Sequence, residues 1–523
     1  MIDGKESILS TQETTAVIVP GCDTLRRTTL SALQQFREHG GKVIFFGAAP
    51  RYVDALPCAD AERFSLRCEC LPWDRVRLNE SLQPLREVSI LTDRGRPADG
   101  LLCAIRADGS CRNVFIVHGR PAVHGVPDQP EDYRISLKGL WTVEKWDTQT
   151  GEIIPLASEY GEQDTFLSWH CWGQDSLLLR LSPAEAGRNR TGARSATLNG
   201  SYGIRMTEEL RLAVEPRTER MLPPPDEIIR GEDNVLVLDT AAWRTDNGPW
   251  EEPEEMLRIG VAAKEMLGIS TAVVSGAQPW TLPAEKPEHT LSLRMAFRTE
   301  TELPAARLAL EDADISRVLF NGKPLSSEQD GFFADEAIRC FPVGPVPAGI
   351  NTVELTKPLT ASTCTENLFL LGDFGVRVCG TETAVLPAPR TLAYGDWTTQ
   401  GLPFYSGPLT YRYRLAGGER LRLRLGLFSA PCVTADLDGK RIANLSLAPS
   451  EADLGFLAPG EHILDITVFP SRINSFGAFH LNDRSVIWFG PKAWRSTGMR
   501  WTRTYRLTPS GLLSEPHLFS AND

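Results

Sequence analysis

The chain has 523 residues, enough for several domains of about 100–200 residues each. Apolar residues make up 42% of it and charged residues 23%, a globular composition that excludes disorder along the whole length. The net charge is −12 and no run of Lys or Arg occurs, which argues against nucleic acid or an anionic membrane as a partner.

No stretch approaches the roughly 18 uninterrupted apolar residues of a membrane span. Residues 1–10 lack the apolar core of a secretory signal, so we expect a cytoplasmic protein. The 11 cysteines are odd in number and form no repeated C-x-x-C pattern, which favours reduced thiols over a disulfide framework.

The N-terminal part has an α/β pattern. Residues 16–21 are a short apolar run ended by Pro20 and Gly21, which is typical of a buried parallel strand. An apolar stripe at helical spacing follows over residues 25–36, and a second buried strand is predicted over 42–47. Residues 113–118 are predicted to be a later strand of the same sheet. We therefore expect a partial α/β domain over residues 1–125.

From about residue 130 the apolar period changes to that of strands. Short alternating runs between residues 133 and 181 predict an antiparallel meander, hence a small β-sandwich. Residues 214–231 contain three consecutive prolines and many charges, and are interpreted as a linker. The predicted domain, with its linker, covers residues 126–230.

Two further β units follow, over residues 231–390 and 391–523. Each has a strand ending in a hairpin turn, Asn321-Gly322 in the first and Asp438-Gly439 in the second, and later a Pro-containing turn and another strand. This weak internal repeat is typical of two successive jelly-roll domains. The predicted fold class is thus mainly β, with a small N-terminal α/β domain and tandem β-sandwich modules.

Two groups of carboxylates attract attention. The run Glu251 to Glu255 precedes a predicted short helix, where acidic side chains usually favour the helix dipole and face solvent. Glu311, Asp312 and Asp314 follow a predicted strand. They are interpreted first as a plain turn, with a calcium site and a catalytic acid left as alternatives. A structural calcium ion is the only cofactor that the sequence suggests.

Several motifs, taken in order, resemble a known group of enzymes. Residues 401–411 (GLPFYSGPLTY) and 471–480 (SRINSFGAFH) look like parts of the galactose-binding-like β-sandwich at the C-terminus of large bacterial glycoside hydrolases. The closest in this respect are the family 106 α-L-rhamnosidase-like enzymes. Residues 17–46 are similar to the latter half of their amidotransferase-like domain, and residues 146–153 (WDTQTGEI) resemble a strand pair of the β-domain that follows it.

The resemblance implies a role without naming a catalytic residue. In such enzymes the catalytic carboxylates lie on a (β/α)₈ barrel upstream of the amidotransferase-like domain, and this sequence has no counterpart of that barrel. We therefore expect an accessory portion that binds carbohydrate and supports a catalytic barrel domain or subunit. Two alternatives stay open: a complete glycoside hydrolase with carboxylates in a cleft between sandwiches, and a structural or partner-binding β protein.

Sugar binding needs flat aromatic faces together with amide or carboxyl groups for the hydroxyls. Trp397, Tyr405, Asn474 and His480 lie in the segments that resemble the loops of the sandwich, as does Phe404. We take the first four as the candidate sugar-binding residues, although aromatic residues in such segments are more often part of a core.

Overall fold

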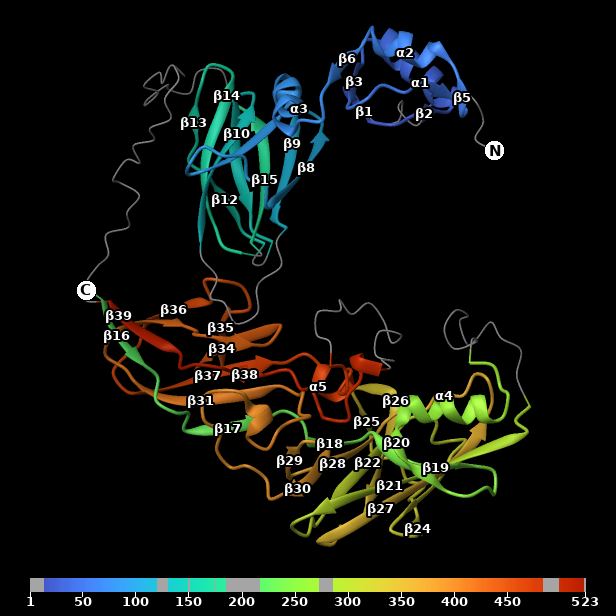
Figure 1. Cartoon of the computed structure of the whole chain (residues 1–523). Helices are drawn as coiled ribbons and strands as arrows, with labels where there is room; N and C mark the ends of the chain where they lie inside the picture. Colours follow the sequence, from blue (N-terminus) through green and yellow to red (C-terminus); the bar gives the residue numbers. More distant parts are fainter. Residues whose placement is uncertain are drawn as a thin grey trace. The chain divides into compact units, whose positions relative to one another are not determined.

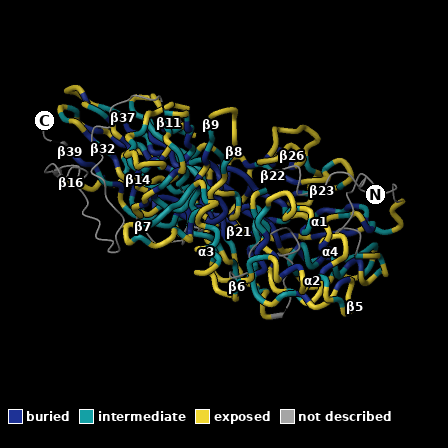
Figure 2. Tube along the Cα trace, turned by 90° about the horizontal axis from the view of Figure 1, so that it is seen from above, coloured by how far each residue is buried: buried dark blue, intermediate teal, exposed yellow. Residues whose placement is uncertain are grey.

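The computed structural model describes residues 14–119, 130–148, 151–173, 175–184, 217–271, 286–482 and 498–521. These residues fall into two compact units, one ending at residue 184 and the other beginning at residue 217 (Figure 1). The chain is mainly β. In Figure 2 the exposed stretches are mainly the turns between elements, and the buried stretches follow the strands. No helix in the described ranges is long and apolar enough to cross a membrane.

The first unit begins with a parallel sheet of three strands in the order β1-β3-β6. The elements are β1 (Ala16–Pro20), α1 (Arg27–Glu38), β3 (Lys42–Phe46), α2 (Ala59–Ser65) and β6 (Glu69–Leu71). A smaller sheet is made by β2 (Thr24–Leu25), β4 (Tyr52–Val53) and β5 (Leu56–Pro57). Leu30 and Leu33 of α1 and Phe64 of α2 pack with Val43 and Phe45 of β3. The predicted strand, helix and strand are thus confirmed, because their apolar stripes match the periods of the two element types.

A β-sandwich completes this unit. Its first sheet contains β13 (Glu159–Tyr160), β14 (Asp164–Cys171), β10 (Glu131–Lys138) and β7 (Val88–Thr92), in that order. Its second sheet contains β12 (Ile153–Pro155), β11 (Trp141–Trp146), β15 (Ser176–Pro183), β9 (Cys111–His118) and β8 (Leu101–Asp108). Helix α3 (Arg75–Leu82) precedes β7.

The prediction that residues 113–118 continue the parallel sheet is wrong. Strand β9 lies between β8 and β15 and pairs antiparallel with both. Val114 and Ile116 are fully buried in the sandwich core, together with Leu179 of β15. A short apolar strand carries no signal of its partners, so its sheet is decided by tertiary packing. The sandwich therefore starts at β7 and not near residue 126.

The second unit contains two sandwiches, and we call the one that comes first along the chain sandwich A. One sheet of sandwich A contains β18 (Asn234–Leu238), β28 (Leu368–Gly372), β22 (Ala306–Leu310), β26 (Asp335–Val343) and β25 (Phe332–Phe333). The other contains β20 (Glu251–Glu255), β19 (Thr240–Thr245), β21 (His289–Thr299), β27 (Gly349–Leu359), β23 (Arg317–Phe320), β24 (Lys323–Pro324), β29 (Gly375–Cys379) and β30 (Glu382–Leu386). Helix α4 (Met256–Met266) follows β20.

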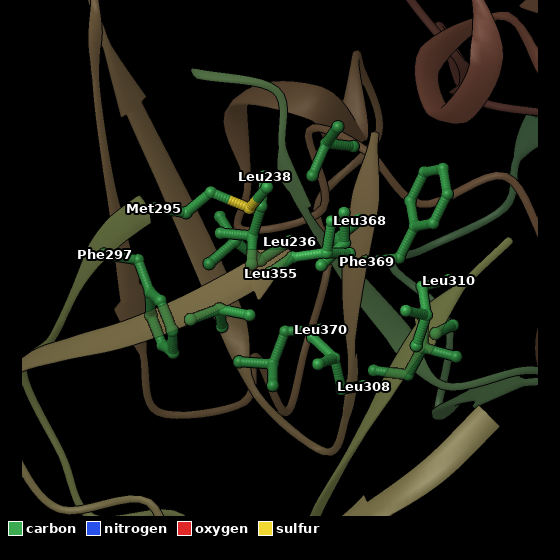
Figure 3. Close-up of a cluster of buried hydrophobic side chains, with 14 of the residues drawn as sticks. Leu236, Leu238, Met295, Phe297, Leu308, Leu310, Leu355, Leu368, Phe369 and Leu370 are labelled. Carbon is green, nitrogen blue, oxygen red and sulfur yellow. The ribbon is translucent and has the colours of Figure 1, made fainter. Parts of the chain in front are cut away.

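The core of sandwich A lies between its two sheets. Figure 3 shows leucine side chains of β18, β22 and β28 opposite Met295 and Phe297 of β21 and Leu355 of β27. Every residue of β18 and β28 is buried, so this sheet is covered on both faces. The predicted Asn-Gly hairpin is confirmed between β23 and β24, where Asn321 and Gly322 have φ of 48° and 75°.

The second sandwich of this unit, sandwich B, has its own core. One sheet contains β16 (Arg217–Met221), β39 (His517–Ala521), β32 (Arg420–Arg424) and β36 (Glu451–Phe456). The other contains β17 (Glu227–Arg230), β31 (Leu409–Ala416), β37 (Glu461–Phe469), β34 (Cys432–Leu437) and β35 (Lys440–Asn444). The two shorter strands β33 (Phe428–Ser429) and β38 (Gly511–Leu512) pair with each other.

The prediction of a linker over residues 214–231 is wrong, because most of the described residues in this range belong to the strands β16 and β17. β16 pairs with the last strand of the chain, β39, and β17 pairs with β31. Strands β16 and β17 both lie at the edge of a sheet, where charged side chains are tolerated, and prolines are tolerated in the connection between them. The composition of this stretch therefore resembles that of a linker.

One segment of the chain returns from sandwich B to sandwich A. After β37 comes the short helix α5 (Ile473–Phe476), and the residues that follow it pack on the outer face of the β18-β28-β22 sheet. The Phe476 ring lies 5.2 Å from that of Phe369 in β28, and Phe479 and Tyr505 join the same core. We call residues 473–482 and 498–507 the return segment.

Candidate functional site

A pocket of about 170 Å³ lies where the return segment covers sandwich A. Its wall on the sandwich side comes from the start of α4, the end of β22, β26 and the residues just before β28, and the return segment supplies the opposite wall. The lining residues are Glu255, Leu257, Glu311, Ile338, Glu366, Asn367, Phe369, Phe476, Gly477, Ala478, Phe479, His480 and Trp501. The pocket thus has an apolar, aromatic interior together with four ionisable groups and an amide.

Glu255 is the N-cap of helix α4. Its two carboxylate oxygens accept hydrogen bonds from the backbone N–H groups of Leu257 and Arg258, each at 3.1 Å. These are two of the donors that a helix leaves unpaired at its first turn, and they favour the ionised carboxylate. Burial acts in the opposite direction and outweighs them, so the pKa of Glu255 lies above its usual value.

His480 is held by a buried carboxylate. Its Nε2 lies 3.0 Å from Oδ2 of Asp239, and the Tyr505 hydroxyl donates to Oδ1 of the same carboxylate at 2.7 Å. The side chains of His480 and Asp239 are only 10% and 3% exposed. Burial lowers the pKa of His480, but the bond to Asp239 and the charges of Asp239 and Glu255 raise it by more, so it lies above its ordinary value. This arrangement joins the return segment to the end of β18.

Trp501 is the tryptophan that borders the pocket. The guanidinium carbon of Arg258 lies 4.3 Å from its ring centroid, a distance that gives a cation–π contact, and the His480 ring lies 6.0 Å away. Arg258 also lies 3.2 Å from Glu254. The indole of Trp501, which is itself part of the return segment, therefore packs between Arg258 in the first turn of α4 and the ring of His480.

Glu311, Glu366 and Asn367 bring polar groups to the rim. Glu311 and Glu366 are exposed and Asn367 is half-buried. The pKa of Glu311 is raised, first by partial burial of its carboxyl group and then by the neighbouring charge of Asp312.

The predicted sugar-binding residues separate into two groups. Trp397, Tyr405 and Asn474 are 0%, 1% and 2% exposed, so none of them offers a face to a ligand in this structure. Trp397 packs edge-on against Tyr405 at 6.1 Å, and the Tyr405 hydroxyl donates to the Pro408 carbonyl at 2.6 Å. Only His480 lines the pocket.

Asn474 pins the return segment to the chain beside β38. Its amide donates to the Thr508 carbonyl at 2.7 Å and accepts from the Thr508 N–H at 2.9 Å. Phe404 is likewise fully buried, within the core of sandwich A. These residues have packing and positioning roles, because a sharp loop next to two cores needs large side chains and a fully bonded amide to hold it.

The three acidic residues considered for calcium point to different partners. Asp312 lies 3.2 Å from the Lys357 ammonium, and Asp314 accepts from Arg339 at 2.8 Å, which lowers its pKa. Glu311 lines the pocket instead. Within the described ranges, no group of three His, Cys, Asp or Glu side chains is arranged to hold a metal ion. The structure therefore gives Asp312 and Asp314 ion-pair partners rather than a shared ligand.

Four of the polar or aromatic pocket residues were missed as site residues, namely Glu255, Glu366, Asn367 and Trp501. Glu255 had been grouped with an acidic run expected to face solvent, yet it is the last residue before the helix and is half-buried. An acidic residue directly before an apolar helix start is an N-cap signal that could have separated it from its neighbours. Trp501 carried no local signal, since its position depends on how the return segment folds back.

Comparisons with known proteins give weak similarities. No protein-family model matches the chain, and no curated protein shows a significant match. A rhamnosidase structure from Novosphingobium sp. PP1Y has 12% identity and a TM-score of 0.40, with 97% of this chain and 33% of that one covered. An α-L-rhamnosidase from Streptomyces avermitilis has 12% identity, a TM-score of 0.18, and coverage of 82% and 34%.

A β-D-mannosidase from Dictyoglomus thermophilum has 12% identity and a TM-score of 0.20, covering 45% of this chain and 31% of that one. This chain spans about a third of the length of each of these three structures. All three TM-scores are below 0.5, so the description of the fold rests on the sheets themselves.

Proposed function

We propose that this chain is a carbohydrate-binding, non-catalytic portion of a rhamnosidase-like glycoside hydrolase, and that the pocket under the return segment is its sugar site. In this role it would also support a catalytic barrel domain or subunit. The observation that carries the proposal is the composition of the pocket, in which the indole of Trp501 and three phenylalanines are combined with carboxyl and amide groups. Sugars need this combination, since their C–H faces pack on rings and their hydroxyls need polar partners.

The size of the pocket is consistent with a single sugar ring. A water takes up about 30 Å³ in the liquid, so 170 Å³ corresponds to on the order of six waters, a volume comparable to that of one sugar ring. Three rim groups, Glu311, Glu366 and Asn367, are accessible to the hydroxyls of such a ligand.

The role of Glu255 favours binding over catalysis. A general acid must present a protonated oxygen to the leaving group, whereas both oxygens of Glu255 accept backbone N–H groups of α4. The other two carboxyl groups, those of Glu311 and Glu366, lie on the exposed rim.

The test is a binding measurement on the full chain with a panel of monosaccharides and short oligosaccharides. We expect at least one sugar to bind, and Trp501→Ala and Asn367→Ala to weaken that sugar by about tenfold or more. Trp501→Phe retains an aromatic ring and should lose less. Trp73→Ala is the matched control, because Trp73 is exposed and belongs to the other unit.

Two results would contradict the proposal. Binding that is unchanged by Trp501→Ala and Asn367→Ala would place the sugar elsewhere on the chain. If no sugar of the panel bound, the structural or partner-binding role would be favoured.

A second candidate function is glycoside hydrolysis in the same pocket. It is favoured by Glu255, whose pKa is raised by burial and which shares the pocket with Glu311 and Glu366. Its test is the release of aryl alcohol from aryl rhamnosides and related glycosides by the full chain. Turnover that Glu255→Gln abolishes and that Glu328→Gln, an exposed control outside the pocket, leaves intact would establish hydrolysis and reject the non-catalytic role.

A further inference from the structure

We propose that the side-chain N–H groups of His480 and Trp501 donate to acceptor oxygens of the sugar bound in the pocket under the return segment. This inference rests on the proposed sugar-binding function and specifies the polar group that the ligand presents to these two residues. Both side chains line the pocket. Within the described ranges, Nδ1 of His480 and Nε1 of Trp501 are buried and neither has a hydrogen-bond partner.

Two unpartnered nitrogen atoms in one pocket call for an explanation. Nearly all buried polar atoms in folded proteins have a hydrogen-bond partner, because a buried polar group without one costs free energy. The centroids of the His480 and Trp501 rings lie 6.0 Å apart, so the two missing partners belong to the same part of the pocket. Oxygen atoms of a bound ligand would supply both.

Only one nitrogen of the His480 ring is bonded within the protein. Its Nε2 lies 3.0 Å from the Asp239 carboxylate. Glu255 is close enough for its charge to act on His480, but no hydrogen bond joins its carboxyl group to Nδ1. The two Glu255 oxygens instead accept the backbone N–H groups of Leu257 and Arg258. Nδ1 is therefore left for a partner from outside the chain.

The Trp501 ring is positioned by a contact that does not use its nitrogen. The guanidinium carbon of Arg258 lies 4.3 Å from the ring centroid. An indole nitrogen can only donate a hydrogen bond, so the one polar atom of the Trp501 side chain requires an acceptor. Trp501 can thus hold a sugar through its N–H as well as by packing.

The ligand reaches the two N–H groups from the cavity that their rings border. Neither nitrogen is open to solvent, so a small adjustment of the rings must accompany binding. Side-chain changes of this kind are common when a ligand or partner binds, and the cavity of about 170 Å³ leaves room for them.

The acceptor oxygen has two sources, a hydroxyl and a carboxylate of the sugar, and the experiment distinguishes them. Arg500, the residue before Trp501, is exposed, and its positive charge favours a carboxylate. We would measure binding of L-rhamnose, D-galactose and D-galacturonate to the full chain by calorimetry, with Arg500→Gln in parallel. A sugar whose affinity falls in Arg500→Gln presents its carboxylate, and one whose affinity is unchanged presents a hydroxyl.

The indole donor is tested by Trp501→Phe, which keeps an aromatic ring and removes the N–H. This variant should weaken the sugar that binds most tightly by about three- to fivefold. Trp73→Phe is the matched control and should leave the affinity unchanged, because Trp73 is exposed and belongs to the other unit.

The imidazole donor is tested by His480→Gln. The glutamine amide can replace Nε2 beside Asp239, but it leaves no donor at the position of Nδ1. Binding is measured at about pH 6, below the pKa of His480, which the bond to Asp239 raises despite the burial of the ring, so that both nitrogens carry protons. We expect a loss of about threefold or more. His289→Gln is the matched control, since His289 also contacts an aspartate, Asp246 at 2.8 Å, and lies outside the pocket.

A spectroscopic measurement separates the hydrogen bond from a loss of packing. In a chain with isotope-labelled indole nitrogens, the Trp501 signal is the one that Trp501→Phe removes from the NMR spectrum. We expect this signal to move downfield when the tightest-binding of the three sugars is added, because an N–H that gains an acceptor is deshielded. Should His480→Gln fail to fold, this signal and Trp501→Phe decide the matter.

The outcomes separate this inference from the function on which it rests. A sugar that binds with unchanged affinity to Trp501→Phe and leaves the Trp501 signal in place would overturn the assignment of the donors, while sugar binding itself would stand. The failure of every sugar to bind would overturn both proposals.

Discussion

At the scale of single residues, the pocket depends on ionisable groups that are buried with partners. Asp239 receives hydrogen bonds from Tyr505 and His480. The pKa of Tyr505 lies well above its ordinary value, chiefly because the residue is buried and further because the Asp239 carboxylate lies beside it. A buried charge is tolerated only when it is paired and hydrogen-bonded. Removal of Asp239, His480 or Tyr505 would therefore leave the remaining buried groups without a partner and lower the stability of the fold. The partners come from distant parts of the chain, and their union holds the return segment in place.

His480 predicts a dependence of stability on pH. Its pKa in the folded state is raised, so its contribution is complete below the unfolded value of about 6.5 and is lost as pH rises through the folded value. We expect His480→Gln to reduce the free energy of unfolding by about 1–3 kcal/mol at about pH 6, and by less at about pH 8.5. Urea unfolding of both proteins at the two pH values measures this, and a larger loss at the higher pH would contradict it.

At the scale of elements, helix α4 has a close contact that its sequence does not reveal. Gly260 lies in the middle of the helix, where glycine costs about 1 kcal/mol relative to alanine. A Cβ at this position would lie 2.3 Å from Oγ1 of Thr365, which is itself buried. The glycine is therefore explained by the approach of the chain that leads to Glu366 and Asn367 at the pocket rim.

Gly260→Ala should destabilise the protein by about 1–3 kcal/mol despite the better helix propensity of alanine. Thr365→Ala removes the hydroxyl that the new methyl group would meet. The double variant Gly260→Ala/Thr365→Ala should therefore be more stable than the sum of the single effects implies, by about 1 kcal/mol. Urea unfolding of the wild type, the two single variants and the double variant gives this coupling energy. Strict additivity would show that the contact between the new methyl group and the Thr365 hydroxyl does not cause the destabilisation.

At the scale of the whole molecule, the second unit joins two cores through a chain that crosses between them. The strand nearest its start, β16, pairs with the last strand, β39, and the return segment carries aromatic residues from sandwich B to the core of sandwich A. All eleven cysteines lie in the described part of the chain, and none forms a disulfide there. Packing and hydrogen bonds, with no covalent cross-link, therefore hold the described elements together.

Thiol titration tests this arrangement. In guanidinium chloride without reductant, we expect all 11 thiols to react with Ellman's reagent. In the native protein Cys171 and Cys340 should react last, because both are buried and burial also raises the pKa of Cys340. A shortfall in denaturant that a reductant restores would reveal a disulfide.

Much of the fold could be predicted because it depends on local periodicity. The first strand, helix and strand, the alternating strands of the sandwiches and the Asn-Gly hairpin follow from apolar spacing and turn residues within a few positions. Local spacing does not indicate which strands pair with each other in a sheet. For this reason β9 was placed in the wrong sheet, and β16 and β17 were interpreted as a linker.

The sequence by itself determined the fold class, the positions of most strands and helices, and the kinds of side chain available for a sugar. Only the tertiary structure decided which of those side chains meet. Burial withdraws Trp397, Tyr405 and Asn474 from any ligand, while the return segment brings His480 and Trp501 to Glu255, more than two hundred residues earlier in the chain. The physical reason is that a pocket is formed by contacts between distant segments, and no local pattern of residues encodes such contacts.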